Sequence, residues 1–173
     1  DEYFGILKKN GVIVDRHERR NHIINSINTA ATNLGLFPDL NEDLINELTD
    51  LVEFPNLIIG NFSEEYLTLP TEVLCTVMKS HQRYIPLFKK EKNVNKLAID
   101  SKDFLSTNFL CISNGLNESN EIIKKGNEKV LKARFADAKF FVEADKRASS
   151  SKRNLKIKNI SYLNDIGNVS DRV

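Results

Sequence analysis

Residues 67–88, LTLPTEVLCTVMKSHQRYIPLF, decide the fold class, because a helix leads directly into a strand there. Pro70 suits the first turn of a helix, and apolar residues recur at helical spacing after it. A polar cluster, Lys79–Tyr84, ends this helix. The apolar run Ile85–Phe88 that follows is typical of a buried strand. The stretch therefore predicts a structure in which helices and strands alternate.

The residues before this stretch indicate helices. Asp15 is a predicted N-cap, and Glu18 three residues later completes a capping box. Apolar residues recur at helical spacing up to Gly35, which suits the position just after a helix. Asn41 is the predicted cap of a second helix.

Further strands and one long helix are predicted on either side of the central stretch. Residues 56–62 form an apolar run in which Gly60 indicates a bulge or a close approach of another group. Residues 108–113 are a second strand candidate. Residues 118–147 are mostly helical, with a break predicted near Gly126.

These elements predict an α+β fold. A helical N-terminal part is followed by a small mixed sheet of short strands, packed with long amphipathic helices. We expect a helical segment at 1–53, an α+β core at 54–147, and at 148–173 a linker that leads into a downstream domain outside this chain.

Composition limits the possible functions. The 173 residues carry 25 Lys and Arg against 24 Asp and Glu, a net charge of +1. A dedicated nucleic-acid binder is usually far more basic, so any polyanion contact must come from local clusters. There is neither a run of about 20 apolar residues nor a signal-peptide pattern, which favours a cytoplasmic protein without a membrane span. The missing initiator Met suggests a fragment of a longer protein.

The polar cluster at the end of the central helix has two readings. Lys79 and Arg83 lie on the same side of a continuing helix, and basic residues in a last turn complement the helix dipole. Alternatively, these cations bind phosphate groups while His81 or Tyr84 stacks on a base. Spacing by itself favours the stabilising role.

The long helix carries a second set of candidates. Lys129, Lys132 and Lys139 gather on one flank, and Arg134 lies on the opposite flank. The lysine flank is either a solvated face or a track for a polyanion. Phe140 points away from the apolar stripe, so we expect a second surface to cover it. The predicted core stripe consists of Leu131, Phe135, Ala138 and Val142.

A third basic run, Arg16–Arg20, opens the Asp15 helix. Cations at a helix N-terminus oppose the dipole, which can mark an anion site. The acidic neighbours Asp15 and Glu18 offset that cost equally well, and this simpler reading is favoured.

Neither a catalytic centre nor a metal site is predicted. The sequence has no GxGxxG, P-loop or HExxH motif, and its histidines and cysteines lack metal-ligand spacing. Cys75 and His81 are six residues apart and would point nearly opposite ways on one helix, so they cannot form a catalytic pair. Cys75 and Cys111 are expected to be buried, reduced thiols.

Short motifs follow one another in a fixed order along most of the chain. They are Leu51–Pro55, Gly60–Phe62, Leu69-Pro70, Glu72–Leu74, Met78-Lys79, His81–Tyr84, Ile112–Gly115, Gly126–Glu128, Val130-Leu131, Ala133-Arg134, Ala136–Ala138 and Phe140-Phe141. This series resembles one protein family, the β subunit of the bacterial, heterotetrameric glycyl-tRNA synthetase, and the resemblance runs from about Gly11 to the end of the chain. The chain departs from the common pattern at Phe54, where Trp is frequent, at Thr71, where Pro is frequent, and in the long polar loop 89–103.

The resemblance implies that the chain is an interior part of a larger subunit, with an HD-like domain and an anticodon-binding region downstream. In this family the α subunit makes glycyl-adenylate from glycine and ATP with Mg²⁺, and the β subunit binds tRNA and supports aminoacylation. The implied partners are tRNA(Gly), the α subunit and the remaining β domains. The family provides no catalytic residue to transfer to this region, and no cofactor is expected in it. The candidate tRNA-binding residues are Lys79, His81, Arg83, Tyr84, Lys129, Lys132, Arg134 and Lys139.

One alternative function stays open at this point. The near-neutral charge and the outward Phe140 also fit a docking module that braces the α subunit or other β domains without touching tRNA. An independent hydrolase or editing site has no supporting residues.

Overall fold

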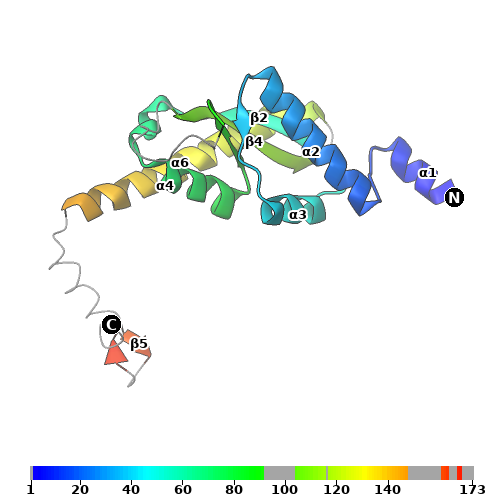
Figure 1. Ribbon diagram of the computed structural model, residues 1–173. Helices are drawn as coiled ribbons and strands as arrows, with labels where there is room; N and C mark the ends of the chain where they lie inside the picture. Colours follow the sequence, from blue (N-terminus) through cyan, green and yellow to red (C-terminus); the bar gives the residue numbers. More distant parts are fainter. Residues whose placement is uncertain (1, 92–103, 116, 148–160, 164–166, 169–173) are drawn as a thin grey trace. The chain divides into compact units, whose positions relative to one another are not determined.

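The computed structural model describes residues 2–91, 104–115, 117–147, 161–163 and 167–168 (Figure 1). Two compact units divide the chain, Asp1–Ala136 and Asp137–Val173. The helices are α1 (Glu2–Lys9), α2 (Arg16–Asn33), α3 (Glu42–Leu51), α4 (Thr71–Thr76) and α6 (Asn120–Arg147), with shorter helical turns η1 (Glu64–Thr68), η2 (Val77–His81) and η3 (Asn117–Ser119). The strands are β1 (Phe37–Pro38), β2 (Pro55–Asn61), β3 (Ile85–Phe88), β4 (Leu105–Asn114), β5 (Ser161–Leu163) and β6 (Gly167–Asn168).

A four-stranded sheet in the order β1-β3-β4-β2 lies at the centre of the first unit. Its three strand pairings are all antiparallel. The predicted α+β class is confirmed, and the strand order, which the sequence did not indicate, is now defined. The connection from β3 to β4 begins and ends at a hydrogen bond in which the Lys89 N–H donates to the Phe104 carbonyl (2.8 Å).

Helices α2 and α3 cover one face of this sheet (Figure 1). The helices begin as predicted, because the Asp15 side chain accepts from the Glu18 N–H (2.7 Å) and the Asn41 side chain accepts from the Leu44 N–H (3.0 Å). Gly35 follows α2 with a positive φ of 65°. Residues before and after position 53 therefore share one core, which consists of Ile23, Ile27, Ala30, Ala31, Leu44, Ile45, Leu48, Val52, Ile85, Leu87 and Leu110.

The first half of α6 packs on the opposite face of the sheet. Of the predicted stripe, Leu131 and Phe135 are fully buried, whereas Ala138 and Val142 are only half-buried. The Phe135 ring lies edge-on to Phe62, with centroids 5.0 Å apart. The Asn127 amide N–H donates to the sulfur of Cys111 on β4 (3.1 Å).

Gly60 marks a close approach rather than a bulge. It pairs directly with Phe109 in an unbroken β2–β4 register, and a Cβ at this position would lie 2.3 Å from the Phe109 ring. The sequence allowed both explanations, and the structure selects one of them.

Two local features differ from the sequence predictions. Helix α6 continues through Gly126, so the predicted break is wrong. Strand β1 lies in a segment that was predicted as helical, and it adds an edge to the sheet by pairing with β3. Within the predicted linker 148–173, the described residues 161–163 form β5, which pairs with β6.

Candidate nucleic-acid interface

The polar cluster Lys79–Tyr84 follows an unusual helix end. The α-helix of α4 widens into a π-helical turn at Val77–His81, and Arg83 then adopts a left-handed conformation with φ 56°. The Tyr84 N–H donates to the Met78 carbonyl (2.9 Å), which closes this wide turn before β3 begins. Both a π-helical turn and a left-handed non-glycine residue cost free energy and occur often at functional sites.

The two cations of this cluster bind carboxylates of the same unit. The Lys79 ammonium pairs with Asp39, whose side chain is 5% exposed. The Arg83 guanidinium donates to the Glu47 carboxylate (2.5 Å) on α3, and both side chains are about half exposed. Their charges are therefore partly neutralised. These contacts fix the end of the helix against the β1–α3 segment. The role is stabilising, but it comes from ion pairs rather than from the helix dipole, because the helix ends before Arg83 and does not continue as predicted.

The aromatic member of the cluster does not fit its predicted role. Tyr84 is only 7% exposed, and its ring stacks on Phe109 with centroids 4.9 Å apart. Burial raises the pKa of Tyr84 to about 12. Because its ring packs inside the unit, Tyr84 is not available to stack on a base, whereas His81 is exposed.

The lysine flank of α6 differs from this cluster, because its side chains face solvent. Lys129 and Lys132 on this flank and Arg134 on the opposite flank are exposed, and among the described residues no carboxylate pairs with them. Glu128, which could have moderated their charge, instead accepts from the Asn61 N–H at the end of β2 (2.9 Å).

Sequence reasoning missed one member of this flank. Lys125 is exposed and precedes Lys129 by four residues and Lys132 by seven, so the three lie on one side of the helix. The same spacing was present in the sequence and could have identified it. Together, Lys125, Lys129 and Lys132 form a row that we call the α6 lysine row.

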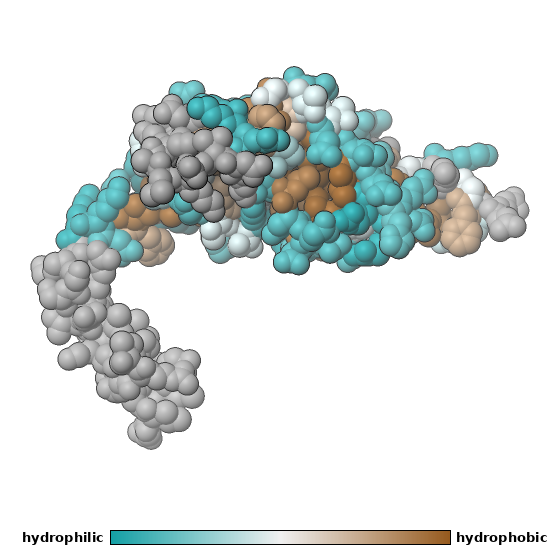
Figure 2. Space-filling view, in the orientation of Figure 1, coloured by the Kyte–Doolittle hydropathy of each residue, from teal (hydrophilic) through white to brown (hydrophobic). Residues whose placement is uncertain are grey.

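Two candidates belong to the second unit, Asp137–Val173. Lys139 is half-buried, whereas Phe140 and its neighbour Phe141 are 70% and 66% exposed. The two rings contact each other edge to face, with centroids 5.7 Å apart. Figure 2 shows a hydrophobic area over this part of α6. Phe140 was the predicted interface residue, and Phe141 was not predicted as one.

The sequence matches a known protein family along its whole length. The family model described as "Glycyl-tRNA synthetase beta subunit" matches residues 1–173. The chain belongs to the glycyl-tRNA synthetase β subunit family.

Individual members of this family align along the whole chain. The glycine–tRNA ligase β subunit of Dictyoglomus turgidum is 40% identical over 174 residues, which cover 100% of this chain and 24% of that protein. The corresponding subunit of Trichodesmium erythraeum is 38% identical over 99% of this chain and 23% of its own length. That of Halothermothrix orenii is 36% identical over 100% of this chain and 24% of its own length. The chain therefore spans about a quarter of the curated relatives that it matches, which confirms the resemblance found from the motifs.

The basic run at the start of α2 has a structural role in this member of the β subunit family. Arg16 donates two hydrogen bonds to Asp50 on α3 (2.7 and 3.0 Å), and Arg20 pairs with Glu42 (2.5 Å). Arg19 donates to the carbonyls of Ile13 (2.6 Å), Val14 (3.2 Å) and Thr49 (2.8 Å). The arginines therefore join α2 to α3 and have a structural role, but the carboxylates that pair with Arg16 and Arg20 are Asp50 and Glu42 rather than the predicted Asp15 and Glu18.

No catalytic arrangement emerges within the described part of this β-subunit chain. Burial raises the pKa of the Cys111 thiol to about 11, partly offset by the hydrogen bond from Asn127, so this thiol is not nucleophilic near neutral pH. Among the described residues, no three His, Cys, Asp or Glu side chains come together as metal ligands. In the same part of the chain, no helix combines the length and apolarity that a membrane span needs.

Proposed function

We propose that this chain contributes to tRNA(Gly) binding and aminoacylation by glycine–tRNA ligase, in the cytoplasm. In this proposal ATP and Mg²⁺ serve the adenylation step on the separate α subunit, and residues 148–173 lead into a further β domain. Membership of the β subunit family supports the ligase role. The observation that carries the tRNA contact is the exposed α6 lysine row.

The α6 lysine row has the geometry of a phosphate-contacting surface. Seven residues separate Lys125 from Lys132, so the row extends about 10 Å along the helix. Lysine ammonium groups bind phosphate as point charges without selecting a base. The cluster at Lys79 and Arg83 is a weaker candidate, because its cations already bind carboxylates.

The test is a salt-dependent titration of tRNA(Gly) with the assembled α and complete β subunits. Lys129→Ala combined with Lys132→Ala removes two charges from the row. The matched control combines Lys9→Ala with Lys90→Ala, which removes two exposed lysines elsewhere. Each lost phosphate contact should lower the magnitude of the slope of log K against log salt by about 0.7–0.9, the range for single strands and B-form duplexes. We therefore expect a clearly flatter slope for the row variant and an unchanged slope for the control.

The proposed tRNA contact is wrong if both variants give the wild-type slope. Aminoacylation of tRNA(Gly) by the same proteins gives a second measurement. A weaker tRNA contact should raise the KM for tRNA and leave the adenylation step unchanged.

A second candidate function rests on the exposed pair Phe140 and Phe141. A contiguous aromatic pair outside a core is typical of a protein–protein contact. It supports a docking role in which the chain braces the α subunit or other β domains. Phe140→Asp should weaken co-purification of α with the complete β subunit, and Phe140→Leu, which keeps an apolar side chain, should not. Full assembly of the Phe140→Asp variant would count against Phe140 as an interface residue.

A further inference from the structure

Strand β2 has an unused edge. It is the last strand in the order β1-β3-β4-β2, so among the described elements only β4 pairs with it. The Phe62 N–H donates to Thr107 and the Gly115 N–H donates to Phe54, both at 3.0 Å. In an antiparallel ladder alternate residues point toward the partner, so the even-numbered residues of β2 face β4. The N–H and C=O groups of Leu57 and Ile59 therefore point away from the sheet.

Both ends of this edge are closed, and its middle is open. Pro55 has no N–H to offer, and the Asn61 N–H is already bound by the Glu128 carboxylate (2.9 Å). No hydrogen bond to the N–H groups of Leu57 or Ile59 occurs within the described part of the chain. Proteins usually protect such an edge with charges, proline or a covering element, because it pairs readily with another strand. On β2, the backbone of the two central apolar residues, Leu57 and Ile59, has no such protection.

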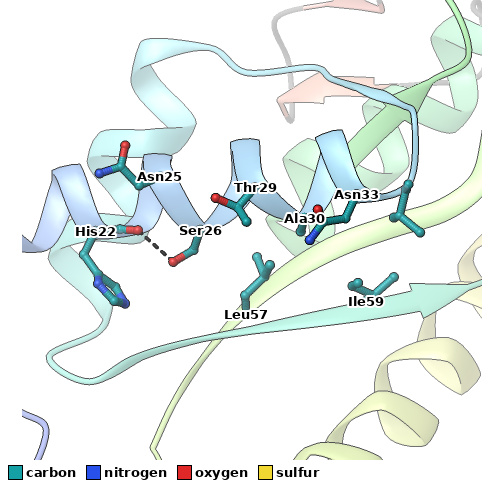
Figure 3. Close-up of a pocket in the computed structure, with 9 residues that line it drawn as sticks. His22, Asn25, Ser26, Thr29, Ala30, Asn33, Leu57 and Ile59 are labelled. Atoms are coloured by element: carbon teal, nitrogen blue, oxygen red, sulfur yellow. Dashed lines mark hydrogen bonds between the residues drawn. The ribbon is translucent and has the colours of Figure 1, made fainter.

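A groove runs along this open edge. It has a volume of about 480 Å³ and lies between α2 and β2. Figure 3 shows polar side chains of α2 on one wall, and Leu57 and Ile59 beside them on the strand. The polar wall carries His22, Asn25, Ser26, Thr29 and Asn33.

The lining fits a polypeptide in extended conformation. The outward N–H and C=O groups of Leu57 and Ile59 would bind the backbone of an added strand. Their side chains offer apolar contact for every second residue of that strand, and the amides and hydroxyls of α2 can bind its polar groups. Among the described residues that line the groove there is no Lys, Arg, Asp or Glu, so a neutral segment fits it better than a charged one.

The dimensions favour an occupant from the same polypeptide. An added strand of about five residues spans only ~17 Å. A stable contact between separate proteins buries roughly 1,200–2,000 Å², which so short a strand cannot provide. An intramolecular segment needs less area, because its effective concentration reaches about millimolar. The chain spans 24% of its Dictyoglomus turgidum relative, so most of a complete β subunit lies outside it.

We infer that the edge of β2 between Leu57 and Ile59 binds an extended, uncharged segment of the same β-subunit polypeptide, from outside these 173 residues, as a fifth strand of the sheet. This inference does not depend on any tRNA contact. The added strand would connect this sheet to another part of the same β subunit.

Hydrogen exchange of the complete β subunit, read residue by residue by mass spectrometry, tests the inference. The even-numbered amides of β2 are bound by β4 whether or not the groove is filled, so they serve as internal controls. If a strand is added, the amides of Leu57 and Ile59 exchange about 100-fold or more slowly than unprotected amides. Rapid exchange of both amides would overturn the inference.

Two further conditions separate the possible occupants. Slow exchange that appears only when the α subunit is bound would assign the groove to α and overturn the inference. Slow exchange that is lost on dilution, together with a change in molecular mass, would assign it to a second copy and equally overturn it. Slow exchange in isolated, monomeric β subunit is the expected result.

A substitution identifies the segment. Ile59→Pro removes an outward N–H and leaves the β4 ladder intact, whereas the control Ile59→Thr keeps that N–H. We expect limited proteolysis of the complete subunit to cut Ile59→Pro at one new segment that stays protected in wild type and in Ile59→Thr. Circular dichroism checks that the variant is folded. If it is not folded, the exchange of the wild-type amides alone decides.

Discussion

Gly60→Ala tests the packing of β2 against β4 at the closest point in the sheet. A Cβ at residue 60 would lie 2.3 Å from Cζ of Phe109, and 2.7 and 2.8 Å from its two Cε atoms. The Phe109 ring is fully buried and stacks on Tyr84 (4.9 Å between centroids). The ring cannot move away without displacing a second buried aromatic group.

The expected size of the effect follows from two opposing terms. Overpacking of a filled core costs about 1–3 kcal/mol. Replacing glycine by alanine restricts the unfolded chain, which favours folding by about 0.4–1 kcal/mol. The steric term is larger, so we expect Gly60→Ala to lower the free energy of unfolding by about 1–2 kcal/mol.

Urea denaturation of residues 1–173 measures this change. Far-UV circular dichroism is the suitable signal, because the chain has no Trp. Gly126→Ala is the matched control, because a Cβ at residue 126 meets no atom within 4 Å in the structure. In the interior of α6 this control should raise stability by about 1 kcal/mol.

The packing argument is refuted if Gly60→Ala is as stable as wild type while the control is stabilised. A double variant sharpens the result. Phe109→Leu removes the ring atoms that the new Cβ would meet, so Gly60→Ala should cost less in that background than in wild type, by about 0.5–3 kcal/mol.

Three further predictions concern single groups. Arg83→Gly should be more stable than Arg83→Ala by about 1 kcal/mol in urea denaturation. Both variants lose the surface ion pair, but only alanine keeps a Cβ at φ 56°. Equal stabilities would contradict strain in the left-handed conformation. The hydrogen bond from Arg16 lowers the pKa of Asp50 in the folded protein. The ionised Asp50 side chain therefore contributes to folding stability above its unfolded pKa, and this contribution is lost as pH falls below about 4. The stability of Arg16→Met should depend less on pH in this range. Cys75 is half-buried rather than buried as predicted, whereas Cys111 is buried, and burial raises its pKa to about 11. Iodoacetamide at about pH 8 should therefore modify Cys75 and spare Cys111, and mass spectrometry of the digested protein distinguishes the two sites.

The sequence predicted those features that depend on near neighbours. The caps at Asp15 and Asn41 bind backbone groups three residues away, so their side chains and spacing were enough. The break predicted at Gly126 was wrong because a glycine in a helix interior costs only about 1 kcal/mol relative to alanine. Packing of Leu131 and Phe135 in α6 more than offsets that cost.

The features that were missed depend on residues far away in the sequence. Strand β1 has two residues, one of them proline, and exists only because β3 pairs with it. The partners of Lys79 and Arg83 lie about 40 residues upstream, in the β1–α3 segment. Because those partners are distant in the sequence, the sequence could not show that the charges of this cluster are partly neutralised. Burial of Tyr84 likewise follows from its contact with Phe109, on another strand.

The hydrogen bond between Lys89 and Phe104 has a consequence for how the family can vary. It joins the two ends of the connection between β3 and β4, so the strands are held at this point irrespective of the number of intervening residues. The entropy of closing a loop grows only logarithmically, and doubling its length costs about 0.6 kcal/mol. Insertions and deletions between these two positions should therefore accumulate during evolution with little selection from stability, and length differences among orthologues should concentrate there.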